Sequence, residues 1–321
     1  MKKVFIGAAA MIIALASCSK ISVVNNDAPQ EIGLKAIAGT MTKAPITAFG
    51  ESTNMGVYAD YKGAATGSVY QAYFADFEFH KNGNSWAGWN GTAHSPKYYP
   101  VSGTLDFFAY SPKCADITAG RDGETGLTFA YTLDDNKTNQ YDVLVSEIRS
   151  GVDKPDEATN VAIKFKHALS LIDINVKKTG TAAIVVKSIT LTGTNHAGTA
   201  TVTYDANRVN ETFPAISWVA TDALGSDLIN KELTLVDDFS NYNTDDADLL
   251  VVPTTGVEKS MTIVYTIDGG IDLSHTFNLG DTGNWAPSTK YTYDITVNPL
   301  EITIAPSITE WTSATTSNPT I

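Results

Sequence analysis

Residues 161–176 read VAIKFKHALSLIDINV, and this stretch decides the fold class. Apolar and polar residues alternate over 161–165, and a mainly apolar run follows over 171–176. A period of two is typical of a β-strand with one buried face, and a short apolar run is typical of a strand covered on both faces. The stretch therefore predicts two strands in succession.

The same two patterns recur on both sides of this stretch. The runs are rich in Thr, Val, Ile and Tyr, and Gly, Asn, Asp and Pro separate them, which is the composition of strands and turns. Further strands are predicted at 105–110, 141–145, 184–191, 200–204, 249–252, 260–267 and 291–297. Only residues 222–229 would fit a short helical turn. We therefore expect an all-β chain built of β-sandwiches with Greek-key connections.

Composition and charge narrow the possible functions. The 321 residues are 43% hydrophobic, enough for a sizeable core, and their number suggests two domains. A polar stretch with a proline at 151–157 divides the chain, so we expect domains at 31–155 and 156–321. The 35 acidic residues outnumber the 22 basic ones, and the resulting net charge of −13 argues against nucleic-acid binding. Cys18 and Cys114 are too few for a disulfide scaffold.

The first residues indicate export as a lipoprotein. Residues 1–3 are a basic start, residues 4–16 form an apolar run too short to span a bilayer, and Leu15-Ala16-Ser17-Cys18 resembles a bacterial lipobox. We expect residues 1–17 to be a signal peptide, Cys18 to carry the lipid, and 18–30 to tether the protein to the cell outer membrane. An ordinary secretion signal with a chance cysteine is the alternative, and it would also export the chain.

No motif predicts catalysis, a cofactor or a metal site. Asp281-Thr282-Gly283 matches the triplet of aspartic proteases, but those enzymes need two such carboxylates and the sequence has one triplet. The five histidines lack the spacing of zinc ligands. Acidic clusters such as 245–248 lack the glycine and the terminal glutamate of a calcium loop. We therefore expect a protein that is not an enzyme.

An aromatic cluster between residues 86 and 110 supports two interpretations. Its members are Trp86, Trp89, Tyr98, Tyr99, Phe107, Phe108 and Tyr110. Consecutive aromatic residues suit a strand covered on both faces, so core packing is the favoured interpretation. The alternative is a surface glycan-binding lipoprotein whose rings stack on sugars, and it requires Trp86 or Trp89 to be exposed.

The two ends of the expected mature chain each carry one amphipathic strand. In residues 31–38 the apolar positions on one face are Ile32, Leu34, Ala36 and Ala38. Residues 39–45 follow with small and polar side chains, and they offer Lys43 to a trypsin-like protease. In residues 300–308 the corresponding positions are Leu300, Ile302, Ile304 and Ile308. Period-two alternation of this kind predicts strands with one apolar face.

Loss of a strand from a sandwich leaves a groove with unpaired backbone and exposed apolar pockets. A strand from a second subunit can fill such a groove. Because the lost strand and the candidate donor lie at opposite ends of the chain, the contact would be head-to-tail and would build an open filament. The alternative is a monomer with two ordinary edge strands.

A series of landmarks along the chain resembles the Mfa-like fimbrillin family. The landmarks are the lipobox, Trp89, residues 97–100, 103–112, 165–170, 251–253 and 285–293, and the closing Ile308-Thr309-Glu310-Trp311. The resemblance implies two tandem transthyretin-like β-sandwich domains, export as a lipoprotein and proteolytic removal of the first strand. It also implies assembly with other subunits into a type V fimbria by strand exchange, a role in adhesion or biofilm formation, and no catalytic residue.

Carried over to this sequence, the resemblance implies a role in assembly for residues near each end of the chain. Cys18 would be lipidated, residues 31–38 would be the expelled strand, Lys43 would precede the cut, and residues 300–308 would be the donor strand. The better-known members are cut after arginine, so the lysine implies a Lys-tolerant protease or an uncut anchor subunit. Pro306 is expected to interrupt the donor strand, because proline cannot donate a ladder hydrogen bond. Position as stalk, tip or anchor and the host or bacterial surface ligand stay open.

Overall fold

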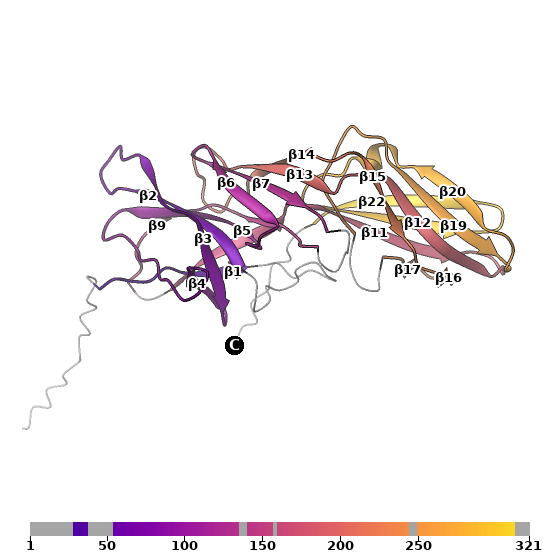
Figure 1. Cartoon of the computed structure of the whole chain (residues 1–321), viewed down its shortest axis with the longest axis horizontal. Coiled ribbons are helices and arrows are strands. Elements are labelled where there is room, and N and C mark those ends of the chain that lie inside the picture. The colour runs from indigo at the N-terminus through magenta and orange to yellow at the C-terminus, as the bar shows by residue number, and fades with distance from the viewer. Residues whose placement is uncertain (1–27, 38–53, 135–139, 157–158, 244–248, 312–321) are drawn as a thin grey trace, which may run out of the picture.

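A computed structural model describes residues 28–37, 54–134, 140–156, 159–243 and 249–311. These residues form strands and one short 3-10 turn, Gly280–Gly283, with no α-helix among them, so the all-β prediction is confirmed. The molecule is elongated (Figure 1). Strands β2 to β4 lie at one end, and strands β12, β19 and β20 lie at the other.

The N-terminal part is one sheet that closes on itself. Its strands are β1 (Gly33–Ile37), β2 (Asn54–Lys62), β3 (Tyr70–Asn82), β4 (Ser85–Trp89), β5 (Thr104–Ser111), β8 (Leu144–Ser146), β9 (Arg149–Val152) and β10 (Asn160–His167). Their order is β2-β3-β4-β1-β10-β8-β5-β9, and β5 also pairs with β2. We call this closed sheet the N-terminal ring. It surrounds a core that contains Phe79, Trp86, Phe107 and Phe165.

A smaller middle sheet combines strands from both halves of the sequence. Its order is β14-β13-β7-β6, and its strands are β6 (Ile117–Asp122), β7 (Gly126–Thr132), β13 (Ala197–Thr203) and β14 (Ala215–Ala220). It shares a core with the outer side of the ring, where Tyr58 and Phe108 pack with Phe129 and Val202. The pairings β7–β13 and β1–β10 both cross the expected boundary after residue 155, and the division into two domains there stays a prediction.

The C-terminal part is a β-sandwich of two sheets. One sheet contains β11 (Ser170–Lys178), β17 (Ser240–Asn241), β18 (Leu249–Val251), β21 (Thr289–Val297) and β22 (Ile302–Glu310). The other contains β12 (Ile184–Thr194), β15 (Gly225–Ile229), β16 (Leu233–Thr234), β19 (Ser260–Ile267) and β20 (Leu273–Asn278). Alternate residues of both sheets meet in one core, as in Tyr293 of β21 and Ile263 of β19. Residues 225–229 of the stretch 222–229 thus form strand β15, residues 222–224 belong to the connection before it, and the expected helical turn is wrong.

A bent two-stranded ribbon joins the middle sheet to the C-terminal sandwich (Figure 1). Strand β13 follows β12 after two residues, and β15 follows β14 after four. Because β13 pairs with β14 and β12 pairs with β15, the four strands form one long ribbon. Asp222 fixes the bend, since it accepts hydrogen bonds from Asn195 Nδ2 at 3.0 Å and from the His196 backbone N–H at 2.8 Å.

Candidate functional site

Strand β1 is one of the strands that form the N-terminal ring, and it lies between β4 and β10. It pairs in parallel with β10 from Gly33 opposite Asn160 to Ile37 opposite Lys164, and Leu34 lies opposite Trp86 of β4. This placement gives β1 a neighbour on both sides. The strand is therefore an integral part of the closed sheet.

Backbone hydrogen bonds extend this attachment to the residues before β1. The Ile32 N–H donates to Lys97 O at 2.7 Å, and the Tyr99 N–H donates to Gln30 O at 2.9 Å. Outside the ladder, His94 Nε2 and Glu31 Oε1 lie 2.6 Å apart. Backbone hydrogen bonds to residues 97 and 99 therefore hold the residues that lead into β1.

The side chains of β1 and of the residue before it fill pockets of the ring. Ile32 and Leu34 are fully buried, and Ala36 is partly buried against the same core. Ala38, Lys43 and Cys18 lie outside the described residues. A ring without this strand would expose Trp86 and Ile163 and would leave facing backbone groups of β4 and β10 unpaired. Such a groove would bind an extended chain with apolar residues at alternate positions.

Strand β22, at the other end of the chain, is attached differently. It pairs with β21 from Val297 opposite Ile302 to Thr289 opposite Glu310, and it is the last strand of its sheet among the described residues. Ile302 and Ile304 are half-buried against the C-terminal core, whereas Leu300 is 98% exposed and Ile308 is 54% exposed. The strand is thus held mainly by its ladder.

Pro306 does not interrupt this strand. It lies in the middle of β22 opposite Tyr293, and ladder pairs continue on both sides of it. The expected interruption is wrong because an edge strand needs hydrogen bonds on one side only, so a proline there is tolerated.

The aromatic cluster packs mostly in the core, as the favoured interpretation expects. Trp86 is buried, as are Tyr99, Phe107, Phe108 and Tyr110. Trp89 is half-buried and stacks on His80, with ring centroids 4.4 Å apart. Tyr98 is 44% exposed. The glycan-binding alternative requires Trp86 or Trp89 to be exposed; Trp86 is not and Trp89 is only in part, so the alternative stays untested.

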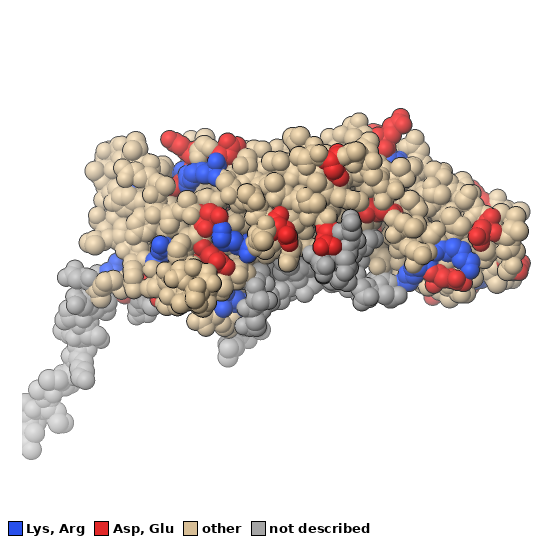
Figure 2. Space-filling model, viewed as in Figure 1, with Lys and Arg blue, Asp and Glu red and all other residues tan. Residues whose placement is uncertain are grey.

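Charge does not mark a binding face. On the side drawn in Figure 2, acidic and basic side chains of the described residues are interspersed, and much of the surface carries neither. Asp281 is exposed and lies in the turn Gly280–Gly283. In the described parts of the chain, no three His, Cys, Asp or Glu side chains are grouped so that they could hold a metal ion. No helix among these residues has the length and apolar character needed to cross a membrane.

Buried charged groups are the main feature that the sequence did not reveal. Arg208 is 5% exposed and donates to Asp60 at 2.8 Å and to Asp106 at 3.2 Å. Burial raises the pKa of Asp60, although the hydrogen bond from Arg208 opposes the shift. Lys259 is 2% exposed, and burial lowers its pKa to about 8. No local motif signals these groups: the partners of Arg208 come from distant segments, and the burial of Lys259 depends on the fold around it.

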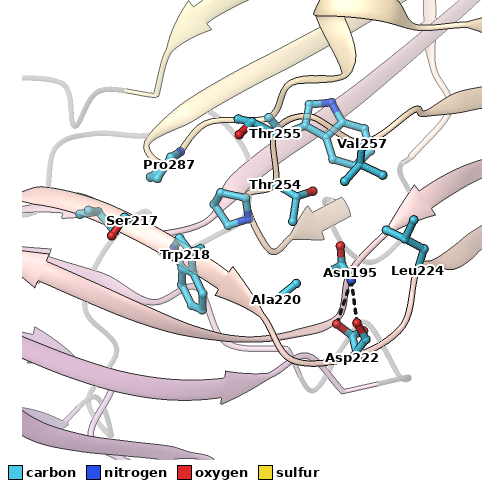
Figure 3. Close-up of a pocket in the computed structure, with 13 residues that line it drawn as sticks. Asn195, Ser217, Trp218, Ala220, Asp222, Leu224, Thr254, Thr255, Val257 and Pro287 are labelled. Carbon is cyan, nitrogen blue, oxygen red and sulfur yellow. Dashed lines mark hydrogen bonds between the residues drawn. The ribbon is translucent and has the colours of Figure 1, made fainter.

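A pocket of about 500 Å³ lies at the bend of the ribbon (Figure 3). Trp218 and Ala220 of β14 form one side of it, and Thr254 and Pro287 from two loops lie across from them. The Asn195–Asp222 hydrogen bonds border it. It is a recess between the middle sheet and the C-terminal sandwich, and two of its polar side chains, Asn195 and Asp222, are hydrogen-bonded to each other at the bend.

Comparison with known proteins finds a matching family and solved structures with a similar fold. The family model described as Fimbrillin-like matches residues 42–311. A fimbrial protein from Bacteroides vulgatus ATCC 8482 has the same fold, with a TM-score of 0.61 and 18% identity over 88% of this chain and 100% of that one. A Bacteroides uniformis ATCC 8492 protein, provisionally described as a cell adhesion protein, has a TM-score of 0.53 and 18% identity over 88% and 99% of the two chains.

No curated protein matches the sequence significantly. The family match nevertheless covers most of the chain, including every strand of the ring except β1 and both sheets of the C-terminal sandwich. The structural matches, at low identity, agree with it at the level of the fold. This chain therefore belongs to the Fimbrillin-like family.

Proposed function

We propose that this protein is a structural subunit of a cell-surface fimbria, exported as a lipoprotein and assembled by protease-triggered strand exchange. The observation that carries the proposal is the placement of β1, which fills the ring immediately before the segment that contains Lys43. Family membership supports the fimbrial role, and the fimbrial and cell adhesion descriptions of similar structures support a role in adhesion or biofilm formation.

A single cut after Lys43 would have two effects. It would separate the ring from lipidated Cys18, and it would detach β1 from the rest of the chain, because both lie before the cut. The subunit would then be held at the outer membrane only by β1 seated in its ring, and release of β1 would free the subunit and empty the groove. An uncut subunit would stay at the membrane with a filled groove, which is the behaviour expected of an anchor.

The burial of β1 explains why the empty groove would be filled again. Ile32 and Leu34 are fully buried, and burial of each such side chain contributes about 1.5–3 kcal/mol. Each ladder hydrogen bond adds about 0.5–1.5 kcal/mol. An empty groove is therefore unfavourable, and any strand with apolar residues at alternate positions that fits the pockets would stabilise it.

Strand β22 of a second subunit offers the matching pattern. Leu300, Ile302 and Ile304 are spaced by two residues, as are Ile32 and Leu34. Leu300 buries nothing in its own subunit, and Ile302 and Ile304 are only half-buried there, so transfer to a groove would increase their burial. The groove and the donor strand lie on different parts of the chain. After each transfer, one end of the assembly still has a free groove and the other end still has a free donor strand, so the filament grows head-to-tail.

The test is limited trypsin digestion of the protein that starts at Cys18, followed by N-terminal sequencing and electron microscopy. We expect a cut after Lys43 and filaments afterwards. Lys43→Gln should be uncut at this site and should stay monomeric. Ile302→Asp with Ile304→Asp should fold and be cut but should form no filaments, because two carboxylates cannot enter an apolar groove.

Two results would overturn parts of the proposal. If the wild type is cut and loses β1 but stays monomeric, strand exchange is wrong for this subunit. If the Ile302→Asp, Ile304→Asp variant polymerises as the wild type does, residues 300–308 are not the donor strand.

A further inference from the structure

The last part of β22 is exposed, but the residue immediately after it has a buried aromatic side chain. Residues 305–310 of β22 are all exposed, yet Trp311 is only 6% exposed. The Trp311 N–H donates to Ser288 O at 2.8 Å. One side chain therefore anchors the end of a strand that otherwise buries little.

The Trp311 ring covers a buried imidazole. It stacks on His167, with the ring centroids 3.6 Å apart and the planes 1° apart. His167 is fully buried, and its Nδ1 lies 2.7 Å from Oδ2 of Asp142, which is 3% exposed. The Ser288 hydroxyl donates to His167 O at 2.5 Å, so the residue that binds the Trp311 backbone also binds the residue beneath its ring. We call His167, Asp142 and Ser288 the Trp311 seat.

Two members of the seat, His167 and Asp142, lie outside the C-terminal sandwich, whereas Ser288 directly precedes β21. His167 is the last residue of β10 in the N-terminal ring, and Trp311 packs in the core shared by the ring and the middle sheet. Ile302 and Ile304 instead contact the core of the C-terminal sandwich. The Trp311 ring therefore connects this strand end to a part of the molecule beyond its own sandwich.

We infer that Trp311 is a latch that holds β22 on its own subunit until assembly. The inference rests on the proposed function, in which β22 becomes a donor. Donation of β22 requires the indole to leave its seat, which exposes a large apolar ring to water and uncovers a buried imidazole–carboxylate pair. Withdrawal of Trp311 is then the step that precedes strand transfer, and it limits premature donation by the uncut subunit.

The latch is tested first without assembly, in the uncut protein that starts at Cys18. Hydrogen exchange followed by mass spectrometry reports the opening of β22. In Trp311→Ala we expect exchange of the amides at 302–310 to be about 10-fold faster or more, with the amides of β1 and β10 unchanged. Trp311→Phe keeps a ring in the seat and should give a smaller increase.

Trp218→Ala is the matched control. It removes an indole that packs against the same core and donates from Nε1 to Ala168 O, but Trp218 lies on β14. We expect exchange in β22 to be unchanged in this variant. Faster exchange throughout the C-terminal sandwich in Trp311→Ala, or unchanged exchange in β22, would overturn the latch whatever happens in assembly.

The second readout is the rate of filament growth after the trypsin cut. We expect Trp311→Ala to grow filaments about 10-fold faster than the wild type, because the seat no longer holds the strand. If β22 is loosened and the wild type assembles, but the variant is no faster, the latch does not limit donation and the inference is wrong. If β22 is loosened and neither protein assembles, the latch stands as a property of the monomer and the proposed function fails.

Discussion

Substitution of Lys259 allows the free-energy cost of a buried charge in this fold to be measured. Its ammonium group donates to Thr254 O at 3.0 Å and lies 4.8 Å from the centre of the Trp285 ring. Burial lowers its pKa from 10.5 to about 8. At about 1.4 kcal/mol for each pH unit between these values, the charged form costs the folded state about 3 kcal/mol.

The sign of the pH dependence follows from these two values. Below pH 8 the folded state must carry the buried charge, so the full cost applies. As the pH rises from 8 to 10.5, the folded state releases its proton before the unfolded state does, and the free energy of unfolding increases. Lys259→Met removes this charge and also one hydrogen bond worth about 1 kcal/mol. We expect the variant to be about 2 kcal/mol more stable than the wild type at pH 7, with the advantage lost near pH 10.5.

The assay is urea unfolding of both proteins at pH 7 and pH 10, followed by tryptophan fluorescence. The buried tyrosines also titrate in alkali, but they are common to both proteins and cancel in the difference between them. Lys187→Met is the control, because Lys187 is partly exposed and pairs with Glu232 at the surface, where the loss is about 1 kcal/mol or less. A Lys259→Met advantage that is equal at both pH values, or a loss of stability at pH 7, would refute the reasoning.

Two further predictions concern other parts of the molecule. Arg208→Met removes the cation that pairs with buried Asp106 and one of the two that pair with buried Asp60, the other being Arg121, and should cost about 3 kcal/mol in urea unfolding. Arg149→Met, which loses the exposed partner Glu211, should cost about 1 kcal/mol or less. Equal losses would contradict this difference. Trp89 is already stacked on His80, so we expect no change in tryptophan fluorescence across a panel of polysaccharides; a change that disappears in Trp89→Ala would restore the glycan-binding alternative.

The strand pattern of this protein could be predicted from its sequence because it is local. The alternation at 161–165 and the apolar run at 171–176 became β10 and β11. Residues 222–229 misled the prediction, because their spacing fits a helical turn in isolation. Pairing with β12, a strand more than 30 residues earlier, places residues 225–229 in β15 instead. Distant pairing of this kind overrides local preference.

The candidate site, too, could be predicted from the sequence only in part. The apolar faces at Ile32, Leu34, Ile302 and Ile304 are visible in the sequence, but the extent of their burial is not. That β1 is enclosed while β22 is exposed depends on which strands lie beside them. The seat of Trp311 was equally hidden, because His167, Asp142 and Ser288 come from three distant segments that only the folded chain brings together.

The bent ribbon has a mechanical consequence for any filament made of this protein. Tension between the ring and the C-terminal sandwich would divide between two routes: Ala168 and Leu169, which join β10 to β11 directly, and the ribbon, which reaches the sandwich from the middle sheet. The Asp222 contacts hold the ribbon route at its bend, so their loss would shift load to the link between β10 and β11. We expect an Asp222→Ala subunit to give way at lower force than the wild type in single-molecule pulling.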